Sequence, residues 1–215
     1  MIEFTLWDIA RNLLLAARWT VTLSLIAFIG GGIVGLVLLV ARLRGNPWAS
    51  RFVGSYVQLF QGTPLLMQLF LVFFGLPLIG IDVSPWVAAA ISLGLYAGAY
   101  LAEIWRGAVE SVPPGQWDAS AALGMGYLRQ LALVILPQAL RLAVPPTVGF
   151  LVQLVKSTAL ASIVGYHELT KTAQILTNAT FQPFAIYGLV ALIYFAICYP
   201  LTACARGLER RLATS

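Results

Sequence analysis

Five apolar runs, uncharged except for Arg141 in the fourth, divide the chain, and each is long enough to cross a lipid bilayer. The first lies between Arg18 and Arg42 and covers residues 19–41. At about 1.5 Å per helical residue it reaches roughly 35 Å, more than the roughly 30 Å of a bilayer core. The others cover residues 52–81, 83–102, about 131–155 and about 184–205. We therefore expect an all-α, polytopic membrane protein with about five spans.

Glycine and proline interrupt two of these runs. Residues Gly62, Thr63 and Pro64 fall in the middle of the second run, which is longer than one span needs. Pro137 and the pair at 145–146 fall within the fourth. A proline inside a helix removes a backbone hydrogen bond and its ring clashes with the preceding turn. We expect a broken second span and a kinked fourth span that enters the bilayer near Gln138.

Four glycines lie close together in the first run, at positions 30, 31, 32 and 35. In lipid no hydrophobic force drives helices together, and small residues let two helix backbones approach closely. We expect this part of the first span to pack tightly against a neighbouring helix.

Positive charges gather on one side of a five-span arrangement. That side carries Arg42, Arg44, Arg51, Arg106, Arg129, Arg141, Arg206, Arg210 and Arg211, and the other carries Arg11, Arg18, Lys156 and Lys171. Cytoplasmic segments are enriched in Lys and Arg, so we expect the N-terminus outside and the C-terminus in the cytoplasm. The mixed stretch 156–183 should then form a re-entrant or surface helix on the outer side.

The composition agrees with a single membrane domain over residues 1–215. Hydrophobic residues make up 60% of the chain and charged residues 10%, whereas a soluble domain has roughly 25% charged residues. The net charge is +5, and the positively charged residues cluster at the ends of the apolar runs. This placement favours anionic lipid headgroups over nucleic acid as the partner of these charges.

The sequence contains no motif for nucleotide, metal or redox chemistry. It has no Gly-x-x-x-x-Gly-Lys-Ser/Thr segment, so the ordinary phosphate-binding loop is missing. Cys198 and Cys204, on one helix, would hold their Cα atoms about 9 Å apart, beyond disulfide reach. His167 has no second candidate ligand nearby. We expect a non-catalytic chain that binds neither metal nor cofactor.

The connection after the third run contains a short predicted helix. The Pro-Pro-Gly sequence at 113–115 should end the preceding helix. Residues 116–123 favour a helix, with Asp118 in its first turn, where the helix dipole stabilises an acidic group. Gly124 or Gly126 could end it in a left-handed cap. On composition alone, an amphipathic connector that lies on the headgroups is the favoured interpretation of this segment.

The segment at about 111–137 resembles the EAA loop of ATP-binding-cassette importer permeases. That loop reads Glu-Ala-Ala, three residues, Gly, nine residues, Ile, one residue, Leu-Pro. Here Asp118-Ala119-Ser120, Gly124, Val134 and Leu136-Pro137 match the spacing, with Asp for Glu, Ser for the second Ala and Val for Ile. In that family the loop forms a coupling helix that seats in a cleft of the ATPase. The resemblance implies an ATPase-coupling role for Asp118, Ala119, Ser120, Gly124 and Pro137.

The resemblance extends from about Trp19 to Arg211. Within the family, the chain is similar to the polar amino-acid branch of these permeases. The segment from Gln61 to Leu66 looks like that branch's Arg-Gly-Thr-Pro-Leu, with Gln61 in place of Arg. Lys156-Ser-Thr-Ala-Leu160 is similar too, although the family more often has Asp and Ser at positions 157 and 159.

This resemblance implies a type I importer-like permease subunit in the bacterial plasma (inner) membrane, importing an amino acid by alternating access. The implied partners are a second permease subunit, identical or related, two ATPase subunits that use ATP and Mg, and an external substrate-binding protein. The replacement at Gln61 leaves the transported amino acid open.

Polar residues within the apolar runs are the candidates for a substrate pathway. They are Gln61, Thr63 and Pro64 at the break and Lys156, Ser157 and Thr158 after the fourth run. Hydrogen bonding between helices, or a lysine reaching to the headgroups, would explain them equally well. Glu103 and Arg106 lie three residues apart on one helix face and are expected to pair.

Two other functions remain open from the sequence. One is a secondary transporter or channel that needs no ATPase. The other is a structural membrane subunit that moves no solute, against which the broken second run and its polar residues argue.

Overall fold

The chain folds as a bundle of α-helices in a computed structural model that describes residues 5–213. No strand occurs among the described residues, which confirms the all-α prediction. The helices are α1 (Leu6–Leu43), α2 (Pro47–Gly62), α3 (Leu65–Phe70), α4 (Leu76–Leu78), α5 (Pro85–Glu110), α6 (Pro114–Ala122), α7 (Tyr127–Gln130), α8 (Leu136–Ser157), α9 (Leu169–Thr180) and α10 (Pro183–Ala213). Two π-helical turns, Leu71–Gly75 and Leu131–Ile135, and a 3₁₀ turn, Thr158–Ser162, join some of them.

Four helical stretches in the described part of the chain are long and apolar enough to cross a membrane. They are Leu6–Leu43, Pro85–Glu110, Tyr127–Ser162 and Pro183–Arg210. The pair Pro47–Gly62 and Leu65–Leu78 passes the same criteria together, but bends by 102° at its break. The expected five spans agree with this result when the bent pair is one span.

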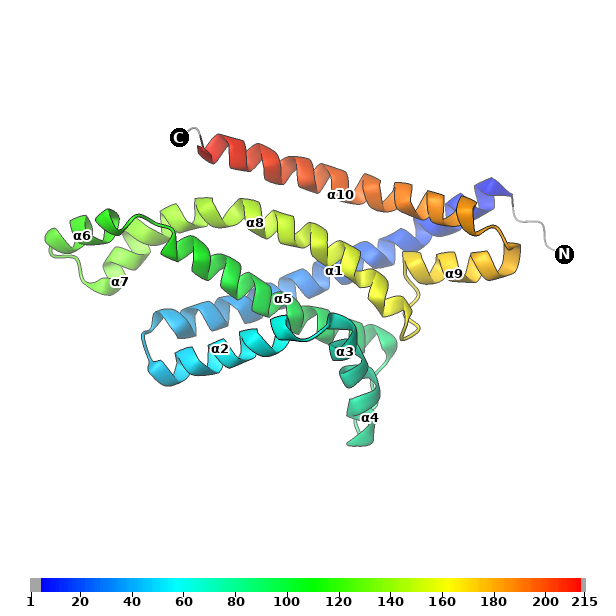
Figure 1. Ribbon diagram of the computed structural model, residues 1–215, viewed down its shortest axis with the longest axis horizontal. Coiled ribbons are helices and arrows are strands. Elements are labelled where there is room, and N and C mark those ends of the chain that lie inside the picture. The colour runs from blue at the N-terminus through cyan, green and yellow to red at the C-terminus, as the bar shows by residue number, and fades with distance from the viewer. Residues whose placement is uncertain (1–4, 214–215) are drawn as a thin grey trace.

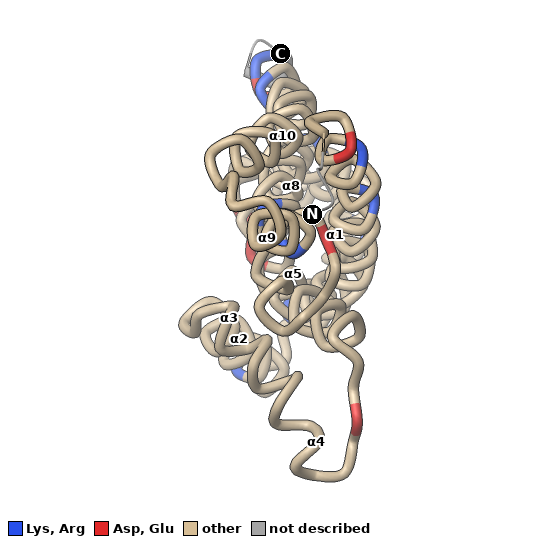
Figure 2. The backbone as a smooth tube through the Cα atoms, turned by 90° about the vertical axis from the view of Figure 1, so that its right-hand side faces the viewer, with Lys and Arg blue, Asp and Glu red and all other residues tan. Residues whose placement is uncertain are grey.

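The long helices run side by side along the molecule. Figure 1 shows α1, α5, α8 and α10 lengthwise, with α6 and α7 at the end where α10 finishes and α9 at the end where α1 starts. The stretch α3–α4 projects away from the bundle (Figure 1). Charged residues are sparse along the tube in Figure 2. The helix predicted between the fourth and fifth spans is present as α9, which lies between α8 and α10 in the chain.

Helices α1 and α5 touch through their glycines. A Cβ atom added to Gly31 would lie 2.5 Å from Ala97 Cβ and 2.8 Å from the Gly94 carbonyl oxygen. One at Gly35 would lie 3.1 Å from backbone atoms of α5. Only glycine permits this approach, so the predicted tight packing is found. The glycines of α1 contribute unequally to this packing, because a Cβ added to Gly30 would meet nothing within 4 Å.

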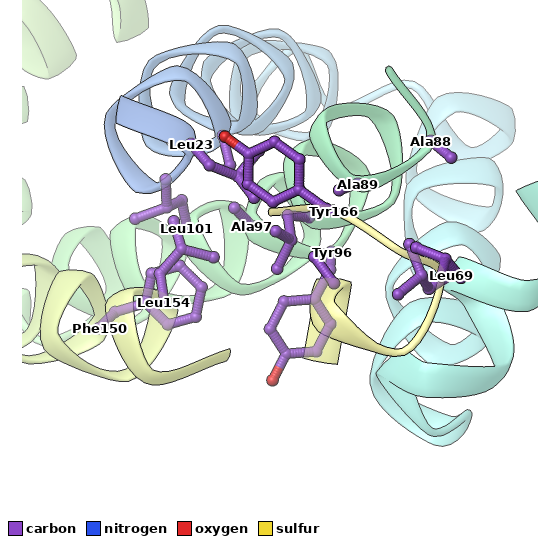
Figure 3. Packing of buried hydrophobic residues seen from close by; sticks show 14 residues of the cluster. Leu23, Leu69, Ala88, Ala89, Tyr96, Ala97, Leu101, Phe150, Leu154 and Tyr166 are labelled. Atoms are coloured by element: carbon purple, nitrogen blue, oxygen red, sulfur yellow. The ribbon is translucent and has the colours of Figure 1, made fainter. Parts of the chain in front are cut away.

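The main buried cluster is built around α5 and seals the centre of the bundle (Figure 3). Its larger members are Leu23, Leu69, Leu93, Tyr96, Leu101, Phe150, Leu154 and Tyr166. Tyr100, at its edge, stacks on Phe150 with ring centres 5.4 Å apart. Lipid is as apolar as these side chains, so van der Waals contact and close backbone approach stabilise the cluster more than exclusion from water does.

Helix α1 starts earlier than its apolar run. Thr5 and Asp8 form a capping box, in which Thr5 Oγ1 accepts from the Asp8 N–H at 3.2 Å and Asp8 Oδ2 accepts from the Thr5 N–H at 3.1 Å. Arg18 lies within the helix, with its guanidinium 5.2 Å from the Trp19 ring centre. Charges mark where hydrocarbon ends, but they do not end a helix, so residues 19–41 are only the apolar part of α1.

Prolines explain the two π-helical turns. Pro77 follows the turn Leu71–Gly75, and Pro137 follows the turn Leu131–Ile135. Each proline lacks an N–H and would clash with the carbonyl four residues before it, and a wider preceding turn relieves that clash. The irregularity expected in the fourth span is thus a π-turn just before Pro137, while α8 runs on unbroken through Pro145 and Pro146.

A buried carboxylate joins three helices near the start of α9. Glu168 is 0% exposed. Its Oε2 accepts hydrogen bonds from Thr20 Oγ1 of α1 at 3.1 Å and from the Tyr194 hydroxyl of α10 at 3.2 Å. Its Oε1 caps α9 by accepting from the Lys171 N–H at 2.9 Å. Burial raises the pKa of the Glu168 carboxyl, and the N–H and hydroxyl donors around it oppose that rise.

Replacing Gly31 with leucine should force α1 and α5 apart. Overpacking of this kind costs about 1–3 kcal/mol, so we expect a lower Tm for the purified protein in detergent. Gly30→Leu is the matched control, since no atom lies within 4 Å of its added Cβ. Equal Tm values for the two variants would contradict the close packing of α1 on α5.

Changing Glu168 should expose its role as a shared acceptor. Glu168→Ala leaves three donors without their acceptor, each costing about 1–3 kcal/mol, and should lower the Tm more than Glu168→Gln does. Because the folded-state pKa is raised, the stabilisation from Glu168 is greatest at low pH and falls as the pH rises from the ordinary value of 4.5. The Tm of Glu168→Gln relative to the unsubstituted protein should therefore increase from acidic to neutral pH. A pH-independent difference would refute this.

Candidate functional site

The segment between the third and fourth spans folds as a short helix, α6, at one end of the bundle (Figure 1). Pro114 is its first residue, because a proline fits the first helical position, where no N–H is needed. The helix thus begins two residues before the expected Gln116. Asp118 is exposed and lies beyond the first turn, so its predicted place in that turn was wrong.

Gly124 ends α6 in a left-handed conformation, with φ at +76°. Its N–H donates to the Ala121 carbonyl at 2.9 Å, and the Met125 N–H donates to the Ser120 carbonyl at 3.2 Å. This pair of bonds is a Schellman motif, which glycine favours. The predicted left-handed cap is therefore at Gly124, whereas Gly126 has a φ of −69°.

One face of α6 is turned inward. Ser120 is 3% exposed, and its hydroxyl donates to the Trp117 carbonyl at 2.9 Å. Trp117 stacks on Tyr127 with ring centres 6.0 Å apart, and the Tyr127 hydroxyl donates to the Leu43 carbonyl at 3.0 Å. Ser120, expected on a docking surface, thus supports the helix from within. Asp118, Ala119 and Gly124 are exposed.

The base of this segment is held by the ends of two spans. A buried cluster joins Val109 at the end of α5 and Val112 just after it to Ile135 and Ala139 around the start of α8. Pro137 is exposed and follows the π-turn that enters α8. A force applied to α6 would therefore reach α5 and α8 directly.

Glu103 and Arg106 form an ion pair, with Arg106 Nη2 2.6 Å from Glu103 Oε2. The other carboxylate oxygen of Glu103 lies 2.9 Å from Arg42 Nη1 of α1. Arg106 also pairs with Glu110. These groups are partly exposed, and together they join the end of α1 to the end of α5 beside the α6 segment.

Gln68 organises the break between α2 and α3. Its Nε2 donates to the Phe60 carbonyl at 2.8 Å, the Thr63 carbonyl at 3.1 Å and Thr63 Oγ1 at 2.9 Å. Pro64 has no N–H to give, so Gln68 supplies donors to carbonyls that the break leaves open. This role of Gln68, as a hydrogen-bond donor to the open carbonyls of the break, was not predicted. A glutamine one turn after a helix-breaking proline is the sequence signal that could have indicated it. Gln61, Thr63 and Pro64 are all exposed at the break.

A small closed cavity of about 10 Å³ lies between α3, α5 and the end of α8. Its lining is Leu65, Leu69, Ser92, Leu93, Ser157, Leu160 and Ala161. It is just large enough for one water molecule. Ser92 Oγ, in its wall, is buried and has no hydrogen-bond partner within residues 5–213. The cavity places Ser157 beside α3, near the predicted break.

The remaining pathway candidates lie elsewhere. Thr158 is 0% exposed, and its hydroxyl donates to the Val155 carbonyl at 2.7 Å, so it forms part of the packed interior and does not line an open path. Lys156 is exposed and faces α10 in a separate hollow. The predicted set is thus divided between the α2–α3 break and the α8–α10 surface.

No group of three His, Cys, Asp or Glu side chains in the described chain is placed to hold a metal ion. Cys198 is buried and Cys204 exposed, and both are free thiols. The site is therefore made of a surface helix, a broken span and polar hollows, which suit movement and binding.

Known proteins match this chain over nearly its whole length. The family model "Binding-protein-dependent transport system inner membrane component" matches residues 31–214. The probable amino-acid ABC transporter permease protein YckA of Bacillus subtilis (strain 168) is 34% identical and covers 99% of both chains. The L-cystine transport system permease protein TcyB of the same organism is 39% identical, over 99% of this chain and 90% of its own.

A solved structure agrees with the fold. A chain of the crystal structure of an amino acid ABC transporter with histidines superposes with a TM-score of 0.91 at 28% identity, over 98% of this chain and 100% of that one. The family model covers most of the chain, and both relatives exceed 30% identity across it. The chain therefore belongs to the binding-protein-dependent transport system inner membrane components, the membrane-spanning permeases of ABC transporters.

Proposed function

We propose that this chain is the permease subunit of an ATP-driven, binding-protein-dependent importer of amino acids. The full-length likeness to an amino acid ABC transporter chain, at a TM-score of 0.91, carries this proposal. Relatives named as amino-acid and L-cystine permeases support the same substrate class. The whole of residues 1–215 then acts as one permease domain in the bacterial inner membrane.

The partners follow from this assignment. Two permease subunits, identical or related, enclose a pathway. Two ATPase subunits bind and hydrolyse ATP with Mg²⁺, and an external binding protein delivers the amino acid. The chain supplies no phosphate-binding loop of its own, so the energy for transport comes from the ATPase subunits.

The helix α6 is the contact for the ATPase. Its exposed residues Asp118, Ala119 and Gly124 form the docking surface, while Pro137 sets the π-turn through which the segment joins α8. Small side chains on an exposed helix let a partner backbone approach closely. Closure of the ATPase pair on ATP would push α6 and, through its packed base, move α5 and α8.

The proposed contact of α6 with the ATPase supports one orientation in the membrane. It lies at the end of the bundle where α10 finishes (Figure 1). An intracellular ATPase places that end in the cytoplasm, which agrees with the excess of arginine on that side. The N-terminus and α9 then lie outside.

The pathway lies where the bundle is irregular. Gln61, Thr63 and Pro64 stand at the bent break, and Ser157 shares a closed cavity with the unpartnered hydroxyl of Ser92. A buried polar group without a partner is costly, and an alternating-access change that opens this cavity would give it water or substrate. Lys156 contributes from the α10 side.

Reconstitution tests the proposed function. The permease, its ATPase and its binding protein in proteoliposomes should take up a radiolabelled amino acid only with internal ATP and external binding protein. Omitting any one of the three should reduce uptake to background. Uptake by the permease alone, driven by an imposed ion gradient, would show a secondary transporter or channel and would overturn the proposal.

Gly124→Val should weaken docking of the ATPase while leaving membrane insertion intact. A β-branched residue is strained at a φ of +76° by about 1–3 kcal/mol, so the end of α6 should distort. Gly126→Val is the matched control, because its φ of −69° suits any residue and its added Cβ meets nothing within 4 Å. Co-purification of the ATPase with the tagged permease is the measurement. Equal recovery with both variants would count against a coupling role for Gly124.

A further inference from the structure

A hollow of about 270 Å³ separates the outer end of α8 from the middle of α10. Its lining is Lys156, Tyr194, Phe195, Cys198, Tyr199, Thr202 and Arg206. Cys198 is at the midpoint of α10 (Pro183–Ala213) and packs on Val152 and Val155 of α8. Both helices belong to stretches able to cross the membrane. The hollow therefore lies within the membrane-spanning part of the bundle.

Two positive charges face this hollow, and no acidic residue is in its lining. Neither Lys156 nor Arg206 is in an ion pair with another described residue. Glu168 accepts a hydrogen bond from the hydroxyl of the lining residue Tyr194 at 3.2 Å. It is itself 0% exposed and is not part of the lining. The space itself is thus electropositive.

Charges in a spanning segment need a reason. The sequence places Lys156 just after the fourth apolar run and Arg206 just after the fifth, yet the two side chains line one hollow. Charged residues in or beside a membrane span usually face a wet cavity or a paired group. Helix α10 is also the least covered span, with 17% of its apolar window buried inside this chain against 56% for α5. Most of α10, including this wall of the hollow, is therefore not covered by the rest of this chain.

We propose that the hollow binds the carboxylate of the transported amino acid, and that Lys156 and Arg206 select against amino acids with cationic side chains. The proposal rests on the proposed function and deepens it by naming the substrate class, neutral or acidic amino acids. Arginine offers a planar fork that matches a carboxylate, and lysine adds a compact positive charge.

The other lining groups suit the rest of such a ligand. The Thr202 hydroxyl donates to the Cys198 carbonyl at 2.9 Å, so its oxygen can still accept from an ammonium group. Phe195 and Tyr199 stack with ring centres 5.2 Å apart and give an apolar, hydroxyl-edged wall. A cationic side chain would bring a third positive charge to a site with no acidic group to receive it.

Direct binding to the permease–ATPase complex, without the binding protein, tests this selection. The complex is placed in nanodiscs of zwitterionic phosphatidylcholine, and the Kd values of L-glutamate, L-glutamine and L-arginine are measured. We expect L-arginine to bind at least about tenfold more weakly than the other two. Arg206→Gln should weaken L-glutamate by about tenfold, and Arg206→Glu should reverse the order of L-glutamate and L-arginine.

Arg141→Gln is the matched control, since Arg141 is an exposed arginine of α8 outside the hollow, and it should leave all three Kd values unchanged. The Tm of each variant shows that it is folded. Unchanged preference in a folded Arg206→Glu variant overturns the proposal. So does occupancy that needs anionic phosphatidylglycerol in the nanodisc and ignores the amino acid, because the anion would then be a lipid headgroup.

Uptake in proteoliposomes separates this proposal from the function on which it rests. ATP-dependent uptake by the unsubstituted importer, with the same amino-acid preference in Arg206→Glu, would remove the charge selection and leave the importer function standing. If the unsubstituted system shows no ATP-dependent uptake, both fail.

Discussion

The contact between α1 and α5 is the constraint on which the rest of the bundle depends. In a bilayer, apolar side chains gain little by leaving lipid, so helices associate through backbone proximity and close packing. Gly31 and Gly35 of α1 lie directly against α5, where an added Cβ would fall 2.5 to 3.1 Å from its atoms. Helix α5 in turn forms the centre of the main buried cluster and contacts α2, α3 and α8.

Two carboxylates tie the helices of the bundle together, one near each end. Glu168 gathers hydrogen bonds from three helices at one end, and Glu103 holds Arg42 and Arg106 at the other. Between these fixed ends, the break near Pro64 depends on the single side chain of Gln68. A bundle tied at its ends and irregular in between suits a protein that changes its access from one side to the other.

The α6 segment and the hollows serve different parts of that cycle. The inward face of α6, fixed by Ser120 and Trp117, makes the segment a firm support for a partner. Residues at the end of α8 line both the cavity beside Ser157 and the hollow at Lys156. A movement of α8 would therefore alter both spaces, and under the proposed function this would couple the ATPase to the solute.

The sequence by itself determined the all-α membrane class, the approximate spans and a left-handed cap at Gly124 or Gly126, because apolar run length, helix breakers and glycine conformation are local properties; the structure selected Gly124. The spacing from Asp118 to Pro137 also carried the resemblance to the EAA loop. Tertiary structure alone decided which side chains face each other. Ser120 and Thr158 are buried, Glu168 accepts hydrogen bonds from three helices, and Arg206 and Lys156 line one hollow. These outcomes depend on how distant helices rotate about their axes when they pack, which no local pattern encodes.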